Sequence, residues 1–199
     1  MKHIICRAGI QSNSSVDEWV KIKDEHKNIL EYFYEDQKKW AFPFQMNTFI
    51  SRVNRIEEIK KNNPQNINII ERSVYTDKNC FASNCYEMGN MTKIEYEIYN
   101  NWHTWLCNSF SIKPSAFIYL YTDPEVSSKR IEKRNRSGEE TIPLDYLKKL
   151  HNLHEIWMKN EVENKIPVLY INCTDDLYEN KEQLINKINM FLTTNYMTM

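Results

Sequence analysis

The sequence predicts an α/β fold in which helices flank a parallel sheet, and two observations carry this prediction. Three short runs are rich in β-branched and aromatic residues, as buried strands are, and segments with helical periodicity lie between them. Strands that alternate with helices pair in parallel through right-handed crossovers. The length of 199 residues, 41% of them hydrophobic, suits one domain, at most with a lid.

The individual elements follow from these patterns. The predicted strands are residues 67–70 (INII), 116–121 (AFIYLY) and 167–173 (PVLYINC). Three helices are predicted from apolar stripes, which are Ile94, Ile98, Trp102 and Trp105; Leu144, Leu147, Leu150 and Trp157; and Leu184, Ile188 and Phe191. A further helix is predicted to begin at Pro124, with Asp123 as its N-cap.

Composition excludes several classes of protein. The formal net charge is −1, which argues against a dedicated nucleic-acid or membrane-surface binder, since such proteins usually carry a basic excess. The five cysteines have no paired CxxC spacing, so we expect reduced thiols and no metal cluster. The N-terminal apolar run is too short for a signal peptide, and no segment has transmembrane length, so we expect a cytoplasmic or nuclear protein.

Charged residues end the first predicted strand, where Glu71 and Arg72 follow INII. In a parallel α/β sheet, ligands bind beyond the carboxyl ends of the strands, because loops and helix N-termini meet there. Glu71 and Arg72 are therefore candidates for handling a charged ligand such as a metal-bound phosphate. The alternative is a structural ion pair that closes a loop.

Three arginines lie close together after the second predicted strand. Arg130 and Arg134 share a helix face, and Arg136 follows two residues later. Clustered guanidinium groups repel one another unless an anion satisfies them, and their planar forks match phosphate oxygens. An equal alternative, on spacing alone, is a solvated face that pairs with Glu132, Glu139 and Glu140.

Longer motifs resemble a known family. The segments ERSVYTDKNCFASN, YEDQKKWAFPFQMNTFISR, WHTWL and RIEKRNRSGEETIPLDYLKKLHNLHEIW closely resemble the deoxynucleoside kinases, the relatives of deoxycytidine, deoxyguanosine and mitochondrial thymidine kinases. The likeness runs from about Val16 to the last helix. It implies a P-loop-kinase fold with an arginine-rich lid at about residues 130–141, usually in a homodimer. It also implies transfer of the γ-phosphate of ATP, with Mg²⁺, to the 5′-hydroxyl of a deoxynucleoside.

The resemblance also assigns roles to particular residues. Glu71 corresponds to the carboxylate that orders the magnesium site, and Arg72 to the guanidinium beside the 5′-oxygen and the phosphates. Preplaced cations of this kind meet the negative charge that spreads during phosphoryl transfer. Arg130, Arg134 and Arg136 correspond to the lid arginines, which favours phosphate binding over the solvated face.

The nucleoside-binding residues implied by the resemblance lie mostly in the N-terminal half. Gln45 corresponds to the amide that reads the base edge, Arg52 and Asp77 to the polar pair beside the base, and Phe81 to the stacking ring. Tyr34 and Glu139 correspond to the pair that holds the 3′-hydroxyl. Leu30, Phe33, Phe44 and Trp19 fall where the family lines its cleft.

Each of these residues also has a structural interpretation. Phe33, Phe44 and Phe81 could be core aromatics, which is their commoner role. Gln45 could cap a helix, and Asp77 could form an Asx-turn. Only the joint order of the residues favours the functional interpretation.

The sequence departs from the family in its ATP-binding half. Only three glycines occur, and the motif GxxxxGK[ST], whose amides cradle phosphates, is absent. We expect the family's first strand to be missing as well, with HIIC (residues 3–6) an unplaced remnant, and a sheet edge left exposed that lowers solubility. Ser14 stands where the family has its proposed general base, a glutamate, and a hydroxyl cannot hold the proton as a carboxylate does.

The sequence therefore indicates a deoxynucleoside kinase of weak or absent activity, since each lost element is typically worth about a hundredfold or more. One alternative is that the start of an active kinase has been clipped. A second is a catalytically silent nucleoside-binding homologue or partner subunit, and a third, less favoured, is a nucleoside monophosphate kinase. The preferred base is left open.

Overall fold

The computed structural model describes residues 22–62, 67–135, 139, 142–175 and 181–196, together with the backbone of residues 2–7. The elements in chain order are β1(Lys2–Arg7), α2(Ile29–Glu35), α3(Gln37–Asn62), β2(Ile67–Glu71), α4(Val74–Thr76), η1(Asp77–Ala82), α5(Ser83–Glu87), α6(Lys93–Ser109), β3(Ala116–Tyr121), α7(Pro124–Arg134), α8(Leu144–Glu163), β4(Val168–Asn172) and α9(Lys181–Tyr196). The segment η1 is a π-helix.

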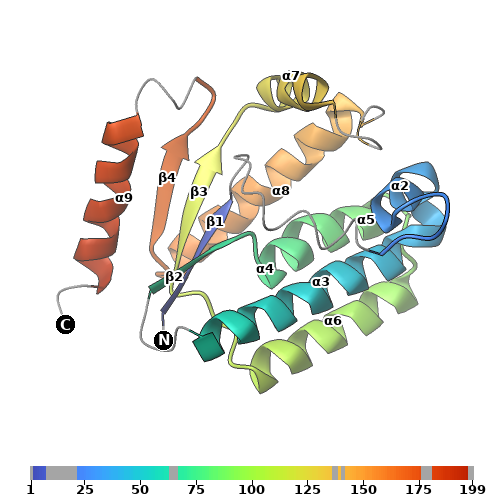
Figure 1. Ribbon diagram of the computed structural model, residues 1–199, viewed down its shortest axis with the longest axis horizontal. Coiled ribbons are helices and arrows are strands. Elements are labelled where there is room, and N and C mark those ends of the chain that lie inside the picture. Colours follow the sequence, from blue (N-terminus) through green and yellow to red (C-terminus); the bar gives the residue numbers. More distant parts are fainter. Residues whose placement is uncertain are drawn as a thin grey trace.

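The four strands form one parallel sheet in the order β2-β1-β3-β4 (Figure 1). β1 is aligned on both sides, with Ile4 opposite Ile69 of β2 and opposite Ala116 of β3. The three strands predicted from apolar runs are confirmed within one residue at their ends. The α/β class with a small parallel sheet is thereby confirmed.

The expectation of a missing first strand is wrong. Residues 2–7, which include HIIC, form β1, and this strand occupies the centre of the sheet between β2 and β3. No gap is left in the sheet, so the reason given for an exposed edge and low solubility does not hold. A central parallel strand needs only a few residues, because both of its ladders are supplied by neighbours.

Helices cover both faces of the sheet, and β3 shows how the sequence divides between them. Phe117 and Tyr119 pack with residues of α8, whereas Ile118 and Leu120 pack with residues of α9. Since side chains alternate across a strand, the continuous apolar run of β3 supplies two hydrophobic cores. Figure 1 shows α9 on one side of the sheet and α8 on the other.

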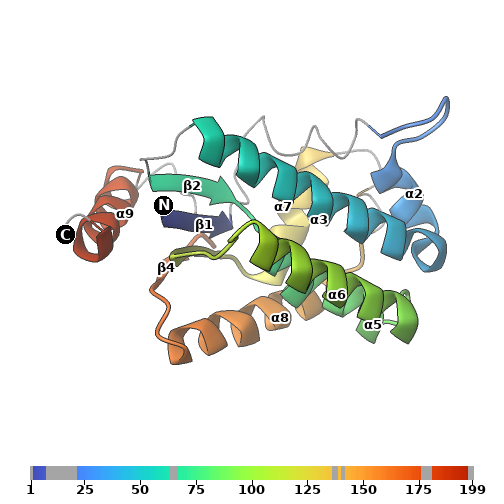
Figure 2. The same ribbon diagram turned by 90° about the horizontal axis from the view of Figure 1, so that it is seen from below.

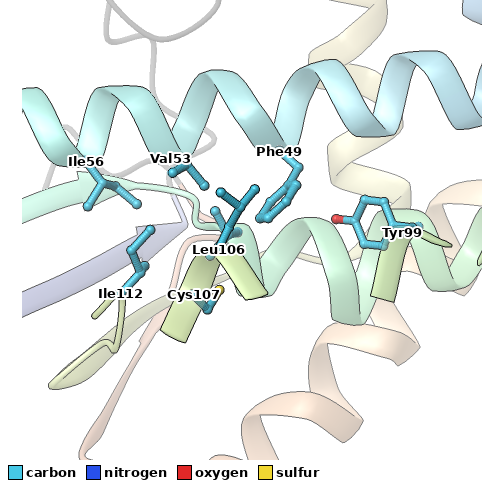
Figure 3. Close-up of a cluster of buried hydrophobic side chains, with 9 residues drawn as sticks. Phe49, Val53, Ile56, Tyr99, Leu106, Cys107 and Ile112 are labelled. Atoms are coloured by element: carbon cyan, nitrogen blue, oxygen red, sulfur yellow. The ribbon is translucent and has the colours of Figure 1, made fainter. Parts of the chain in front are cut away.

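A layer of helices extends the molecule beyond the sheet. α3 and α6 lie side by side in Figures 1 and 2 and contact each other. Capping boxes begin α2, at Asn28 with Glu31, and α6, at Thr92 with Glu95. Figure 3 shows the apolar side chains that α3 and α6 bury between them.

The helices predicted from apolar stripes are all present as α6, α8 and α9. α7 begins at Pro124 as predicted, but the Asp123 side chain makes no capping bond and accepts a hydrogen bond from the Tyr121 hydroxyl at 2.6 Å. No helix in the described part of the chain is both long and apolar enough to cross a membrane.

The apolar stripe of α6 does not face the core of the monomer. Ile94, Trp102 and Trp105 are 73%, 47% and 56% exposed, and Ile98 is also exposed. The buried face of α6 is a different one, which carries Tyr99, His103, Leu106 and Cys107. Trp102 and Trp105 contact each other edge to face, with ring centroids 5.5 Å apart.

Candidate functional site

The turn after β2 fixes Glu71 and Arg72 at the carboxyl edge of the sheet. Glu71 is the last residue of β2, and Arg72 has a φ of 56°, in the left-handed region that residues other than glycine rarely occupy. The Ser73 hydroxyl accepts hydrogen bonds from the amides of Tyr75 and Thr76, each at 3.1 Å, and so caps α4. A backbone strain of about 1–3 kcal/mol, held by such a cap, is typical of functional sites.

Arg72 reaches from this turn across the next helical segment. Its guanidinium carbon lies 5.1 Å from the centroid of the Phe81 ring, within the range of a cation–π interaction. Phe81 belongs to η1, and π-helical segments occur often at functional sites. The two residues predicted to meet the phosphates and to stack on the base are thus adjacent.

One face of α3 carries buried polar residues. Gln45, Thr48 and Arg52 recur at intervals of three and four residues, and Gln45 and Thr48 are buried while Arg52 is nearly so. The Arg52 Nε atom lies 2.6 Å from Oδ2 of Asp77, a buried residue of η1. Burial raises the pKa of the Asp77 carboxyl, and the charges of Arg52 and then Arg72 oppose this shift.

Several buried polar atoms on this face, and one on the facing helix α6, have no hydrogen-bond partner within the part of the chain that the structure describes. They are Oε1 of Gln45, Oγ1 of Thr48 and the hydroxyl oxygen of Tyr99. Folded proteins leave few such atoms unsatisfied, because each costs about 1–3 kcal/mol. Since Gln45 and Thr48 share a helix face with Arg52, their unsatisfied atoms favour a binding site for a polar molecule at this face.

The predicted sugar-binding residues also come together. Arg134 of α7 donates from Nε to Oε2 of Glu139 at 3.1 Å, and Nη2 contacts the same oxygen. Burial raises the pKa of the Tyr34 hydroxyl well above its usual range, and the charge of Glu139 is the next cause, opposed by Arg72 and Arg134. Tyr34, Glu139, Arg134 and Arg72 therefore lie within electrostatic reach of one another.

Two further residues connect these groups: Cys85, to which the sequence assigned no role, and Tyr146, which it did not single out. Nε2 of Gln45 lies 3.8 Å from Sγ of Cys85, which is buried in α5. Burial raises the pKa of the Tyr146 hydroxyl well above its usual range, and Tyr34 and then Cys85 raise it further in their ionised forms. We infer from these contacts that the polar face of α3 and the Tyr34–Glu139 group belong to one site.

An apolar cluster borders the site. Leu30, Phe33 and Phe44 are buried together with Cys85, and the rings of Phe33 and Phe44 stack at 4.7 Å. Their predicted role in lining the cleft remains a prediction, because aromatic residues packed in this way also serve as core. Trp19, Ser14 and Arg136 lie outside the described residues.

The two described lid arginines have protein partners. Arg130 donates to the backbone carbonyls of Cys173, Thr174 and Asp175, at 2.8, 3.2 and 3.2 Å. It thereby connects α7 to the segment that follows β4. Arg134 pairs with Glu139, as the solvated-face alternative expected, although Glu139 is buried. The predicted phosphate contacts of the lid arginines remain predictions.

Sequence reasoning missed Thr48, Tyr99, Cys85 and Tyr146. Thr48 could have been found, because it falls between Gln45 and Arg52 at helical spacing. The other three lie on helices whose orientation toward the site is set by packing, and the sequence carries no local signal for them.

The arrangement combines three chemical capacities. The Gln45 amide and the Arg52–Asp77 pair can bind a planar molecule that has donors and acceptors on its edge. Tyr34 and Glu139 can hold a hydroxyl group, and Arg72 can meet negative charge. Among the described residues, no group of three or more His, Cys, Asp or Glu side chains could hold a metal ion.

The chain is similar in sequence to known proteins. The family model for deoxynucleoside kinases matches residues 10–193. The chain is 37% identical over 200 residues to deoxycytidine kinase 2 of Gallus gallus, covering 91% of this chain and 76% of that protein. Human deoxycytidine kinase is 34% identical over 197 residues, with the same coverage. Mitochondrial deoxyguanosine kinase of Xenopus laevis is 34% identical over 181 residues, covering 83% of this chain and 68% of that protein.

Proposed function

The chain belongs to the deoxynucleoside kinase family, and we propose that its site binds a deoxynucleoside and directs the γ-phosphate of ATP to the 5′-hydroxyl. The observation that carries this proposal is the buried polar face of α3, whose unsatisfied atoms lie beside the Arg52–Asp77 pair. A base supplies the donors and acceptors that these atoms lack.

In this proposal the nucleoside lies between α3 and the segment that follows β2. Gln45 pairs with the base edge, Arg52 and Asp77 bind beside it, and Phe81 stacks on the ring. Tyr34 and Glu139 hold the 3′-hydroxyl. The supporting observations are the burial of Gln45 and Asp77 and the effect of the Glu139 charge on the pKa of Tyr34.

The phosphate end of the site lies at the carboxyl edge of the sheet. Arg72 neutralises the charge that develops on the transferred group, and the lid at about residues 130–141 adds Arg130, Arg134 and Arg136. Glu71 fits a role in holding Mg²⁺, which typically uses one or two carboxylates and the phosphate oxygens, and the ion supplies charge neutralisation when it is bound.

Deoxycytidine is the first substrate to test. Two of the relatives reported above are named deoxycytidine kinases and one is named a deoxyguanosine kinase. The Gln45 amide carries both a donor and an acceptor, as the edge of cytosine does.

A second candidate function is nucleoside binding without turnover. It is favoured by the absence of GxxxxGK[ST] from the 199 residues and by Ser14 at the general-base position. We propose that the 199-residue chain by itself binds deoxynucleosides well and phosphorylates them slowly. As a silent homologue it could serve as a partner subunit.

Calorimetric titration with deoxycytidine, combined with a radiolabelled-ATP assay, separates the two functions. We expect Glu71→Ala to keep most of the nucleoside affinity and to lower turnover to background, while Glu58→Ala, on the exposed side of α3, changes neither. Turnover by the unmodified chain no higher than that of Glu71→Ala would indicate the silent homologue. A chain that binds no deoxynucleoside would overturn the proposal.

We further propose a homodimer that forms through the exposed face of α6. Ile94, Ile98, Trp102 and Trp105 form an apolar stripe along one helix, and such stripes commonly mark interfaces. Sedimentation analysis should show a dimer that Trp102→Glu dissociates, whereas Met190→Glu on exposed α9 leaves it intact. An unchanged dimer in Trp102→Glu would exclude this interface.

We also propose a cytoplasmic location. Cys80, Cys85, Cys107 and Cys173, the cysteines with described side chains, form no disulfide, which suits a reducing compartment.

A further inference from the structure

Cys85 occupies a position that the proposed function does not use. It lies in α5, is 1% exposed, and places Sγ 3.8 Å from Nε2 of Gln45. Burial raises the pKa of this thiol to about 12, so the group is a neutral thiol at physiological pH. A neutral thiol can accept a weak hydrogen bond from an amide N–H or donate one to an amide oxygen, and here it faces the amide nitrogen.

The Cys85 contact fits one orientation of the Gln45 amide. Among the described residues, the Cys85 sulfur is the polar partner found for the Gln45 side chain, and Oε1 has none. Gln45 is 2% exposed, so bulk water does not take the place of a partner. In this arrangement the amide nitrogen faces the sulfur, and the amide oxygen is left for a ligand.

The orientation of this amide has a chemical consequence for base recognition. Cytosine presents an exocyclic amino donor beside a ring-nitrogen acceptor, whereas a 4-keto pyrimidine presents a carbonyl acceptor beside a ring N–H donor. A glutamine amide must turn by 180° to pair with the second pattern after pairing with the first. A group that fixes the amide therefore selects between the two classes of base.

We propose that Cys85 is a positioning residue that orients the Gln45 amide and thereby makes the site prefer 4-amino over 4-keto pyrimidine deoxynucleosides. The inference rests on the proposed function, which names deoxycytidine as the first substrate. The orientation that accepts cytosine leaves deoxyuridine with its carbonyl facing the amide oxygen and its ring N–H facing the amide nitrogen. Two such mismatches cost more than the loss of one hydrogen bond.

The surroundings of Cys85 allow a clean substitution. The side chain packs in an apolar cluster with Ile29, Phe44 and Met91, so valine, which is apolar and similar in volume, suits the site. Cys85→Val removes the sulfur acceptor. Cys85→Ser keeps an acceptor, because a hydroxyl oxygen can accept from the same amide hydrogen.

The test is calorimetric titration of the full 199-residue chain with deoxycytidine and with deoxyuridine, which differ only in this base edge. We expect deoxycytidine to bind more tightly, and the ratio of the two Kd values to fall about fivefold in Cys85→Val, the worth of one weak hydrogen bond. Cys85→Ser should retain the ratio. The matched control Cys107→Ala, which shortens another buried cysteine on α6, should retain it as well.

The outcomes separate this inference from the proposed function. A chain that binds both nucleosides equally, or a Cys85→Val variant that melts cooperatively and keeps the ratio, overturns the role of Cys85 and leaves deoxynucleoside binding in place. A chain that binds neither nucleoside overturns both. If Cys85→Val does not fold, Cys85→Ala removes the same sulfur atom, and the same fivefold fall in the ratio of the two Kd values is expected.

Discussion

Two adjoining faces of α3 are both buried, but one is apolar and the other carries polar atoms whose hydrogen bonds are not made within the described protein. Phe49, Val53 and Ile56 pack against α6 and its neighbours in an apolar cluster (Figure 3). Gln45 and Thr48, on the adjoining face of the same helix, keep buried polar atoms without a hydrogen-bond partner among the described residues. Burial of the apolar side chains stabilises the folded protein, whereas burial of polar atoms without partners destabilises it.

This difference indicates which face serves stability and which serves recognition. A buried polar face that weakens the free protein is retained where a ligand completes its hydrogen bonds. Substitutions on the two faces should therefore have different effects. Those on the apolar face should lower the free energy of unfolding, and those on the polar face should lower nucleoside affinity.

The largest effect is expected for Phe49→Ala. Phe49 is fully buried, and its ring lies 5.7 Å from that of Tyr99 and 5.4 Å from that of His103. Removing it leaves a cavity, which should lower the free energy of unfolding by about 3–5 kcal/mol in urea titrations. The neighbouring exposed Ile50→Ala serves as control, and a loss below about 1 kcal/mol for Phe49→Ala would contradict the assignment of this face.

Substitution of the Arg52–Asp77 pair tests whether these two residues serve stability, nucleoside binding or both. Asp77→Leu leaves a guanidinium in a buried site, so we expect the free energy of unfolding to fall by about 3 kcal/mol. The double variant Arg52→Met, Asp77→Leu should recover most of this loss, because it removes both charges, yet it should not bind deoxycytidine. Recovery of both stability and binding would show that the pair is only structural.

The apolar face also predicts a dependence of stability on pH through His103. Burial, followed by the charge of Lys78, lowers the pKa of His103 from 6.5 to about 4. As pH falls below 6.5, the unfolded chain takes up a proton that the folded chain does not, so stability present above pH 6.5 is lost between pH 6.5 and pH 4.

The free energy of unfolding that is lost through His103 should reach about 2–3 kcal/mol by pH 4, since each unit of pKa shift corresponds to about 1.4 kcal/mol. Urea titrations at pH 7.5 and pH 4.5 measure it, and His103→Gln should lose distinctly less stability between the two. Equal losses in both proteins would mean that other groups account for the acid sensitivity.

The smallest effect on stability is expected on the polar face. Gln45→Leu replaces a poorly satisfied amide with an apolar group of similar size, so the free energy of unfolding should stay the same or rise by up to about 1 kcal/mol. Deoxycytidine affinity should fall at least about tenfold, the worth of a pair of lost hydrogen bonds. If Gln45→Leu lowered the free energy of unfolding and still bound deoxycytidine, Gln45 would serve stability and not recognition.

Sequence reasoning predicted most helices and strands correctly, and its errors concern where an element lies in the fold and which of its faces is buried. β2, β3 and β4 were predicted from their composition, and α6, α8 and α9 from their periodicity. HIIC was not placed, although it forms β1 at the centre of the sheet, because a six-residue strand carries little signal without its neighbours. The stripe of α6 was found, but its exposure depends on which face packs against α3.

The sequence by itself determined the α/β class, the order of most elements and the family, because these depend on local periodicity and on long motifs. It also supplied the candidates Gln45, Arg52, Asp77, Glu71 and Arg72. Only the tertiary structure decided that α3 carries a poorly satisfied polar face, that Cys85 contacts Gln45, and that Arg130 binds the carbonyls after β4. These contacts join residues far apart in the chain, and burial and distance across a fold are set by packing, which no local pattern encodes.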